Sequence, residues 1–593
     1  MANKILNEMI FKPALDYIDD GHIHGVLSPF EPGERILKAG TQIAPEFKLL
    51  WKDIRMLKDV EVKMRDGVTI YTDIYMPANS KETKFPTLIL WSPYGKSAGS
   101  APRYTNLFNM IGMGNSWNSG LTKFEGADPD YWCQRGYAVC NPDPRGIAHS
   151  KGNNITLMGS QEAEDCYDLI EWIAKQEWSN EKTALTGTSY LAFSQWFIAA
   201  TQPPHLTCIN PHEGLSDAYR DLVCNGGIPD KNFIERLQVN HVSAVSSTMR
   251  EDIMIGEMKE YPLADAPLWL DKKADISNIS IPVYCVASYS NTLHTMGTFR
   301  QWRKIRTQDK WLRIHNTQEW PDYYSDAGQE DRQKFFDYYL KGIDNGWKET
   351  PHVRYSLLDM EGGDLLNIPA GEFGYGENVE YIKFYLDGKL RELSKVASTE
   401  EVIAKYDTQG LSGCISFMTT FDEETNLVGY PKLHLYAEVE GADDADVFVW
   451  MQKLDKNGNM LAEITVPNHS ASIYDFVDDG ASIIRYKGSW GRLRLSMRHL
   501  DEKESTDEVP AYSFDRVEKL EKGQVVEADI VMSPIGLKFY KGESIRVIIS
   551  PKEEYGNGMM PGTSGCTPNN KGWQFIHTGG DKASYLQLPV LKK

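Results

Sequence analysis

The chain has 593 residues, of which 41% are hydrophobic and 11% aromatic, and it carries a formal net charge of −20 with a pI near 5.2. This apolar content is enough for two or three folded domains, which excludes a disordered chain. The strong negative charge repels nucleic acids and anionic membranes, so we expect neither as a partner.

The cysteines and the chain start indicate where the protein works. The eight cysteines are scattered, with no C-x-x-C pair and no His/Cys cluster at zinc spacing. The first residues lack the apolar core of a signal peptide, and no later stretch approaches the roughly 20 apolar residues of a membrane span. We therefore predict a cytoplasmic protein with reduced thiols, no metal and no cofactor.

The first 57 residues have a mixed pattern, which predicts an extension packed on the domain after it. From Val60 to Met64 alternate residues are apolar, and the alternation resumes from Val68 to Tyr75 after the turn residues 65–67. Alternation with period two on both sides of a turn predicts a β-hairpin. We expect a sheet to begin here.

Apolar strands then alternate with helical stretches. Strands are predicted over residues 85–91, 136–140, 183–188, 206–211, 281–286 and 310–315. This alternation predicts an α/β fold with a doubly wound, mostly parallel sheet. Residues 216–278 have helical patterns without strands, and we expect them to form a cap over the carboxyl edge of the sheet, where such folds bind ligands.

The pattern changes after the amphipathic helix predicted at 329–341. Short alternating strands separated by Gly, Asn and Asp turns predict a separate all-β domain, which we expect to be a jelly-roll sandwich. The expected parts are a 1–57 extension, a 58–215 first core segment, a 216–278 cap, a 279–349 second core segment and a 350–593 β domain.

One segment of the predicted core has the layout of a nucleophile elbow. A short apolar strand ends in Gly187-x-Ser189-Tyr190 and passes directly into a helical stretch. A serine on such a turn has its hydroxyl clear of the sheet, beside the N-terminus of the next helix. Ser189 is thus a candidate nucleophile for acyl transfer, although a helix N-cap serine would explain the position alone.

Several further motifs occur in order along the chain. They include Arg65-Asp-Gly, Ser92-Pro-Tyr-Gly-Lys96, Asp143-x-Arg-Gly146, Gly214-x-Ser-Asp217 and Ser584-Tyr-Leu586. With the elbow, they make the chain resemble the cocaine esterase and Xaa-Pro dipeptidyl-peptidase (CocE/NonD) family of α/β-hydrolases from Val60 to the end. The resemblance implies a hydrolase core, a helical cap and a jelly roll, with ester or amide hydrolysis through an acyl-enzyme.

The resemblance also implies roles for particular residues. Ser189 is the nucleophile, and the oxyanion is held by the Tyr94 hydroxyl and the Tyr190 backbone N–H. A tyrosine in a Pro-Tyr-Gly turn can also be a packing residue with a satisfied hydroxyl, so the role of Tyr94 has a structural alternative.

The other two triad positions depart from the family pattern. The chain has Asn291 where the family has its aspartate, and an ungapped reading places Glu319 where the family has its histidine. A serine nucleophile needs a base, and histidine suits neutral pH. We predict His315 as that base, with His294 as the alternative. Glu319 is our choice for the group that orients it, and Asn291, Asp322 and Glu213 stay open.

The substrate is only broadly indicated. Aromatic residues in the loop 97–130 favour a hydrophobic small molecule, and the short cap favours a carboxylic ester hydrolase over an Xaa-Pro-type peptidase. An acyltransferase is a further alternative, because only the exclusion of water separates it from a hydrolase. Decay of the triad would instead leave a non-catalytic ligand-binding protein. The jelly-roll faces of this family suggest a homodimer.

Overall fold

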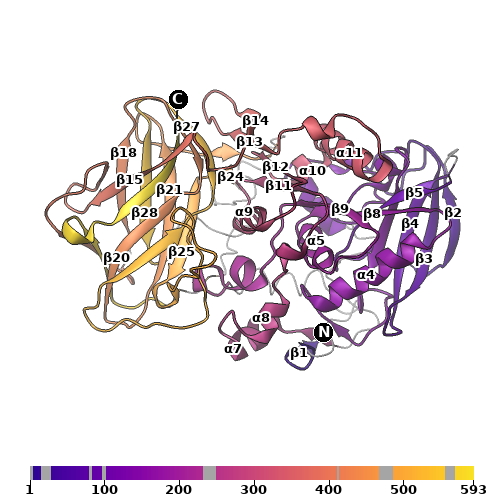
Figure 1. The fold of residues 1–593 in the computed structure, drawn as a ribbon, viewed down its shortest axis with the longest axis horizontal. Coiled ribbons are helices and arrows are strands. Elements are labelled where there is room, and N and C mark those ends of the chain that lie inside the picture. The colour runs from indigo at the N-terminus through magenta and orange to yellow at the C-terminus, as the bar shows by residue number, and fades with distance from the viewer. Residues whose placement is uncertain are drawn as a thin grey trace.

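The computed structural model of the chain describes residues 5–14, 29–78, 83–96, 102–230, 249–410, 413–466, 485–553, 566 and 568–592. Figure 1 shows two bodies side by side, a core of strands and helices and an all-β domain. Parts of the predicted extension, the predicted cap and the loop 97–130 lie outside the described residues. The predicted fold class is confirmed: an α/β core is followed by a separate β domain.

Within the described ranges, the core is built on one sheet of eleven strands. Seven neighbouring strands, from β6 to β13, run parallel, and antiparallel strands flank them at both edges. In spatial order the strands are β14 (Leu365–Ala370), β13 (Val353–Leu357), β12 (Lys310–His315), β11 (Val283–Ser288), β9 (Leu206–His212), β8 (Ser179–Thr188), β5 (Phe85–Ile89), β6 (Ala138–Asp143), β4 (Thr69–Pro77), β3 (Ile54–Lys63) and β2 (Gly33–Leu37).

The domain limits differ from those expected at two places. The segment predicted as an extension supplies β2 and the start of β3, so it is part of the core sheet. The sheet also continues through β13 and β14, beyond the expected boundary at residue 350. β2 is almost fully exposed, so its sequence has no apolar period that marks a strand, whereas β13 and β14 form an antiparallel edge pair that resembles the strands of a β domain.

Helices cover both faces of this sheet. In Figure 1, α4 and α5 lie below β8, whereas α10 and α11 lie above it. The bounds are α2 (Pro102–Met110), α3 (Pro129–Cys133), α4 (Ser160–Ala174), α5 (Tyr190–Ala200), α9 (Thr295–Lys304), α10 (Glu319–Tyr324) and α11 (Asp326–Lys341). Every residue of α5 from Tyr190 to Ala199 is buried, and the helix is apolar on all sides, as a central helix requires.

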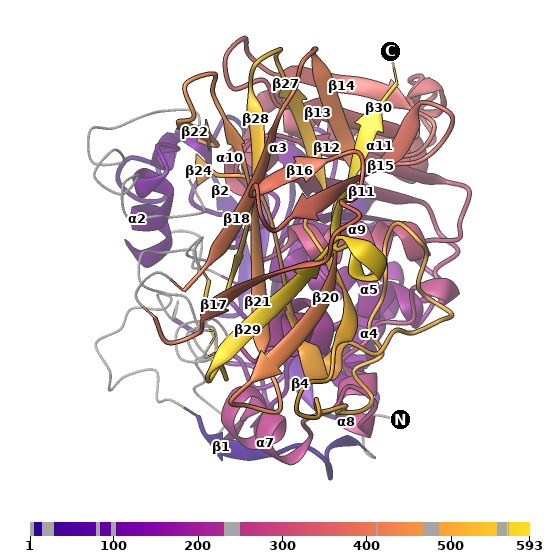
Figure 2. The ribbon, with the colours of Figure 1, turned by 90° about the vertical axis from the view of Figure 1, so that its left-hand side faces the viewer.

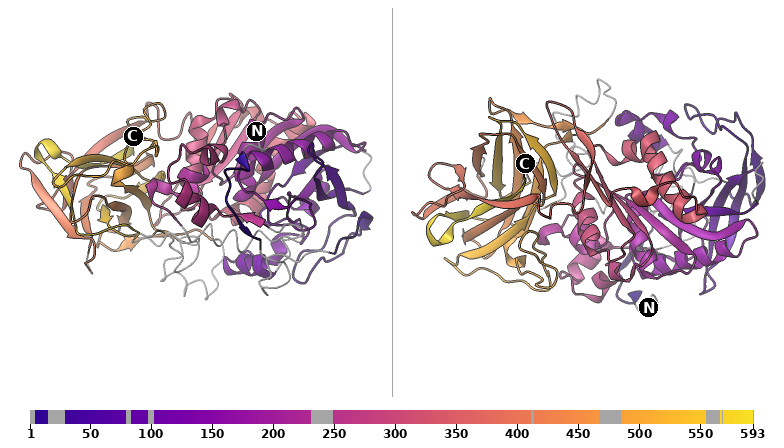
Figure 3. Two further views of the ribbon diagram at one scale, coloured as in Figure 1. Left: turned by 90° about the horizontal axis from the view of Figure 1, so that it is seen from below. Right: turned by 45° about the horizontal axis from the view of Figure 1, so that its top comes forward.

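The described part of the cap lies between the core and the β domain. It contains the helices α7 (Met258–Glu260) and α8 (Pro267–Asp271), short helical turns, and the strand β10 (Met249–Glu251). β10 pairs with β1 (Phe11–Pro13) and with β7 (Asn154–Ile155), so the start of the chain is tied to the cap. Figure 3 shows these elements from below, beside the N-terminal end.

The β domain faces the viewer in Figure 2. Its strands pair almost entirely antiparallel, and several of them have more than one partner, so the sheet branches. The strands are β15 (Val379–Asp387), β16 (Glu392–Ser394), β17 (Val402–Asp407), β18 (Ile415–Thr420), β19 (Thr425–Gly429), β20 (Lys432–Glu440), β21 (Asp446–Leu454), β22 (Met460–Leu461), β23 (Glu463–Ile464), β24 (Arg485–Tyr486), β25 (Ser489–Arg494), β26 (Val526–Val531), β27 (Ile535–Phe539), β28 (Ser544–Ser550), β29 (Trp573–Thr578) and β30 (Tyr585–Leu591). The jelly-roll topology stays a prediction.

Backbone hydrogen bonds join the two bodies. The Leu358 N–H donates to the Gly536 carbonyl at 2.8 Å, and the Leu358 carbonyl accepts from the Lys538 N–H at 3.0 Å. The Gln318 N–H, in the loop after β12, donates to the Thr465 carbonyl of the β domain at 2.7 Å. In the described part of the chain, no helix is long and apolar enough to cross a membrane.

Candidate active site

Polar side chains gather where the central parallel strands end. Tyr94 follows β5, Ser189 follows β8, Glu213 follows β9, His294 follows β11 and Glu319 follows β12. The carboxyl ends of parallel strands share one edge of a sheet, so the topology alone brings these five loops together. Local turns and side-chain contacts then decide which of the five groups meet.

Ser189 sits on a strained turn between β8 and α5. Its backbone has φ 55° and ψ −120°, outside the usual region for a residue with a side chain. Its N–H donates to the Glu213 carbonyl at 3.2 Å, and Glu213 itself has φ 53°. The turn is as tight as the sequence predicted, since a Cβ on Gly187 would lie 2.4 Å from the Leu191 Cβ.

The histidine beside Ser189 is His294. Its Nε2 lies 3.1 Å from the Ser189 Oγ, which is hydrogen-bonding distance for a nucleophile and its base. His294 is placed by a turn at the start of α9, where the Asn291 Oδ1 accepts from the N–H groups of Leu293 and His294 at 3.1 and 3.2 Å. Burial lowers the pKa of His294 to about 3, so its ring is neutral and able to accept a proton.

His315, our predicted base, is placed elsewhere. Its Nε2 faces the Glu213 Oε1 at 2.6 Å, and its Nδ1 lies 3.9 Å from Asp322. It is the last residue of β12, so its side chain follows the strand register and has no loop to carry it toward the elbow. The structure therefore brings His294, the alternative, to Ser189.

Glu319 does lie beside the base, with its Oε2 3.7 Å from the His294 Nε2. The same oxygen accepts a hydrogen bond from the Asn291 Nδ2 at 2.9 Å, so the two residues that depart from the family pattern contact each other. Burial, with the nearby carboxyls of Glu213 and Glu125, raises the pKa of Glu319 well above its usual value. This environment thus favours the neutral form of the Glu319 carboxyl.

The remaining acid candidates, Glu213 and Asp322, belong to a neighbouring cluster. Glu213 accepts from the Ser288 Oγ at 2.8 Å and faces His315, while Asp322 pairs with Arg313. Glu213 thus contributes its backbone carbonyl to Ser189 and its carboxylate to His315.

The two residues predicted to hold the oxyanion, Tyr94 and Tyr190, both lie next to Ser189. The Tyr94 hydroxyl hydrogen-bonds Ser189, and the pKa of Tyr94 is raised well above its usual value by burial and by the Glu125 carboxyl, so it stays a donor. Tyr190 is the first residue of α5, and N–H groups of a first helical turn have no acceptor within the helix. Its hydroxyl is used otherwise, donating to the Glu162 Oε2 at 2.6 Å.

Glu125 is a residue that the sequence did not suggest. The hydroxyls of Tyr94 and Ser189 lie close enough to its carboxyl to lower its pKa by hydrogen bonding, but burial dominates and raises that pKa to about 8. The Trp320 Nε1 donates to its Oε1 at 3.0 Å. A single glutamate between Phe124 and Gly126 in a long loop carries no motif, so no pattern could have identified it.

The Glu125 loop is fixed by a buried cation. Lys123, with no exposed surface, donates from its Nζ to the carbonyls of Ser92 and Pro142 at 2.9 and 2.6 Å. These carbonyls follow β5 and end β6, so the lysine binds the loop to the carboxyl edge of the sheet. Glu125 reaches Ser189 as a result.

Aromatic rings surround this end of the site. Phe124 stacks on Tyr104 with centroids 3.8 Å apart, and it packs edge-on to Tyr94 at 5.3 Å. Phe108 lies 5.5 Å from Trp320, the partner of Glu125. The apolar surroundings explain why the buried carboxyls hold their protons.

One group of side chains has the arrangement of a metal site. The ligand atoms of His212, His315 and Asp322 lie within 4.8 Å of one another. However, Arg313 donates to both carboxylate oxygens of Asp322 and, against the effect of burial, holds the pKa of that carboxyl well below its usual range. A guanidinium in this position opposes a second cation, so the cluster fits a structural ion-pair network better than a metal site.

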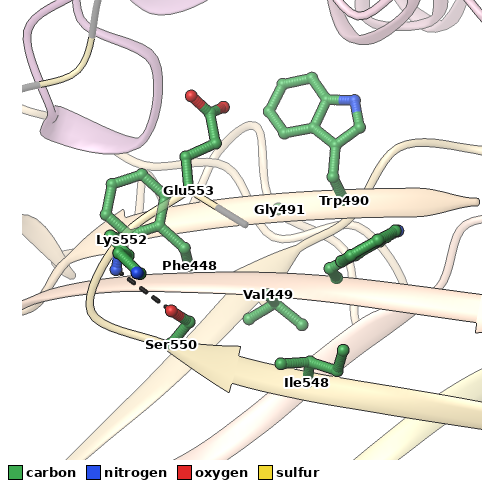
Figure 4. A pocket seen from close by; sticks show the side chains of 9 residues that line it. Phe448, Val449, Trp490, Gly491, Ile548, Ser550, Lys552 and Glu553 are labelled. Atoms are coloured by element: carbon green, nitrogen blue, oxygen red, sulfur yellow. Dashed lines mark hydrogen bonds between the residues drawn. The ribbon is translucent and has the colours of Figure 1, made fainter. Parts of the chain in front are cut away.

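A hollow in the β domain, drawn in Figure 4, is too small to be a substrate site. Phe448, Trp450 and Trp490 line it together with Lys552 and Glu553, on the strands β21, β25 and β28. Its free volume is about 10 Å³, room for about one water molecule.

Comparisons with known families cover most of the chain. A model described as X-Pro dipeptidyl-peptidase (S15 family) matches residues 66–318, and one described as X-Pro dipeptidyl-peptidase C-terminal non-catalytic domain matches residues 345–587. The first range contains the core with Ser189, and the second contains the β domain.

Individual relatives include both esterases and peptidases. A solved structure of a CocE/NonD family hydrolase from Staphylococcus aureus is 31% identical, with a TM-score of 0.85, and the match covers 96% of this chain and 98% of that one. Cocaine esterase from a Rhodococcus species is 29% identical over 162 residues, 27% of this chain and 24% of that protein. A putative Xaa-Pro dipeptidyl-peptidase from Bacillus anthracis is 20% identical over 428 residues, 63% of this chain and 69% of that protein.

Proposed function

Because the chain belongs to the CocE/NonD family of α/β-hydrolases, we propose that it is a serine hydrolase that cleaves a carboxylic ester through an acyl-enzyme on Ser189. The family resemblance stated from the motifs is confirmed. The observation that carries the proposal is the 3.1 Å contact between the Ser189 Oγ and the His294 Nε2.

The reaction follows from this contact. The Ser189 oxygen attacks the substrate carbonyl carbon while its proton passes to the His294 Nε2, and the carbonyl oxygen becomes an oxyanion between the Tyr94 hydroxyl and the Tyr190 N–H. His294 then returns the proton to the leaving alcohol as the acyl-enzyme forms. Water enters next, gives its proton to His294 and releases the acid, after which Ser189 regains its proton.

Two features support an ester of a hydrophobic molecule over a peptide with a free amino terminus. Binding a charged amine requires an ionised carboxylate, but burial raises the pKa of Glu125 to about 8 and that of Glu319 well above its usual value, which favours the neutral form of both carboxyls. The aromatic side chains around Phe124 favour an apolar acyl or alcohol group.

Labelling by a fluorophosphonate probe tests the proposal. We expect the parent protein to form one covalent adduct on Ser189, found by mass spectrometry of its peptides, and Ser189→Ala to form none. A panel of p-nitrophenyl esters and Xaa-Pro p-nitroanilides then separates the two activities. Labelling with cleavage of the anilides alone would favour the peptidase, and no labelling at all would favour a non-catalytic binding protein.

The alkaline side of the pH profile should depend on Glu125. Its carboxyl is neutral below a pKa of about 8 and charged above it, and a negative charge beside Tyr94 and Ser189 opposes the developing oxyanion. We therefore expect kcat/KM to fall above about pH 8. Glu125→Gln keeps an acceptor for Trp320 and cannot ionise, so its rate should hold over the same range.

The raised pKa of Glu125 also makes the stability of the fold depend on pH. The folded protein keeps the Glu125 proton up to about pH 8, whereas the unfolded chain loses it near the usual value of 4.5, so the free energy of unfolding falls as the pH rises between these values.

Values of kcat/KM for the parent and for Glu125→Gln, measured from about pH 6 to pH 10, check the predicted alkaline fall in rate. A flat parent profile, or an equal alkaline fall in the variant, would contradict it.

A further inference from the structure

A large cavity lies between the core, the cap and the β domain, away from Ser189. It encloses about 620 Å³, within the range of small-molecule sites, and α9 contributes residues from Met296 to Lys304 to its wall. None of the residues that meet Ser189 lines it. His294 precedes the first turn of α9, and the cavity wall begins at Met296, so the helix that carries the base on one end also lines the cavity.

The wall of this cavity, which we call the basic cavity, is cationic. Eight Lys and Arg side chains line it against two carboxylates, those of Asp275 and Glu504, although the whole chain carries a net charge of −20. A cleft lined by one sign of charge concentrates its field and attracts small ions of opposite sign. A nucleic acid, by contrast, would meet the repulsive outer surface.

Some of these cations are already neutralised within the protein. Arg220 pairs with Asp217 at 2.9 Å, Arg300 with Asp221 at 3.0 Å, and Lys304 with Glu504 at 2.7 Å. Such pairs are structural and leave little charge for a ligand.

Three cations at the mouth of the cavity differ. Arg303, Arg306 and Lys503 are exposed, and within the described ranges no carboxylate lies at ion-pair distance from any of them. Arg303 belongs to the last turn of α9, where a cation also balances the helix dipole. The helix dipole does not explain Lys503, which belongs to the β domain and lines the same cavity.

Aromatic rings lie behind these charged side chains. Phe299, Tyr430 and Phe514 border the cavity, but each is at most 2% exposed, so they offer no ring face to a ligand. Arg303 lies over the Tyr430 ring, with its guanidinium carbon 5.0 Å from the centroid. A ligand in the cavity therefore meets the charged groups more than the rings.

We propose that the basic cavity binds a small phosphorylated molecule through its phosphate groups. The phosphates lie against Arg306, Lys503 and Arg303. The proposal stands on the cavity alone and is independent of the esterase activity.

Isothermal titration with ATP, without divalent cations, tests this assignment. We expect ATP and tripolyphosphate to bind with similar affinity, adenosine to bind at least about tenfold more weakly, and ATP affinity to fall as salt rises. The double variant Arg306→Gln/Lys503→Gln should weaken ATP binding by about tenfold or more. Both side chains are exposed and lack carboxylate partners, so their loss leaves no buried charge unpaired.

The matched control is Lys389→Gln/Lys541→Gln, two exposed lysines of the β domain outside the cavity, with the same change in net charge. It should bind ATP as the parent does. Absence of ATP binding, or an equal loss in the control, would overturn the proposal. Adenosine binding as tightly as ATP would also overturn it, because the phosphates would then contribute nothing. Far-UV circular dichroism of each variant verifies folding.

Discussion

Replacing His294 by alanine should lower kcat/KM for a p-nitrophenyl ester about a thousandfold or more, with little change in the amount of folded protein. The imidazole is the group that meets the Ser189 hydroxyl, at 3.1 Å, and its depressed pKa leaves it neutral over the working pH range. Without it, the carboxyls of Glu125 and Glu319 are the described groups left beside the serine, and burial raises the pKa of both, which favours their protonated forms.

The matched variant is His315→Gln. His315 is equally buried and also lies beside a carboxylate, but that carboxylate is Glu213. Glutamine keeps a polar amide in the cluster, so we expect a loss within about tenfold. The reverse outcome, with His315→Gln inactive and His294→Ala active, would make His315 the base and require its loop to rearrange when substrate binds.

Replacing Tyr94 by phenylalanine should lower kcat about a hundredfold and leave KM nearly unchanged, because the hydroxyl acts on the oxyanion more than on the bound ester. The ring itself is not lost, and its packing on Phe124 and Tyr190 persists. Steady-state kinetics on one ester over a range of concentrations separates the two parameters.

Tyr324→Phe is the control for this substitution. Tyr324 belongs to the same aromatic group, packing on Phe108 at 5.8 Å, but its hydroxyl donates to the Gly126 carbonyl at 3.0 Å. Its removal should affect stability more than kcat. If both tyrosine variants lost kcat equally, the Tyr94 effect would be one of packing and not of oxyanion binding.

The elbow was predictable because its determinants are local. Gly187, Ser189 and Tyr190 are neighbours in the chain, and the tight turn follows from the small residue and the strand before it. The fold class followed from strand and helix periodicity in the same way. The residues that form such a pattern are close together in the chain, so the pattern can be recognised in a single sequence.

The base and the buried acids were not predictable in this way. His315 and His294 both follow core strands, and only the turn made by the Asn291 side chain decides that His294 points at Ser189. Glu125 depends on Lys123 reaching carbonyls far away in the sequence. Choices of this kind are made by tertiary contacts that leave no local pattern.

The hydrogen bond between the Gln318 N–H and the Thr465 carbonyl links Glu319 to the opposite half of the chain. The Gln318 side chain also accepts from the Trp320 N–H at 2.7 Å, at the start of α10. The β domain therefore supports the loop that carries the carboxyl next to the base. A truncated protein ending after α11 would lose this support, so the hydrolase half is not a detachable module, and engineering aimed at a smaller enzyme must keep both halves.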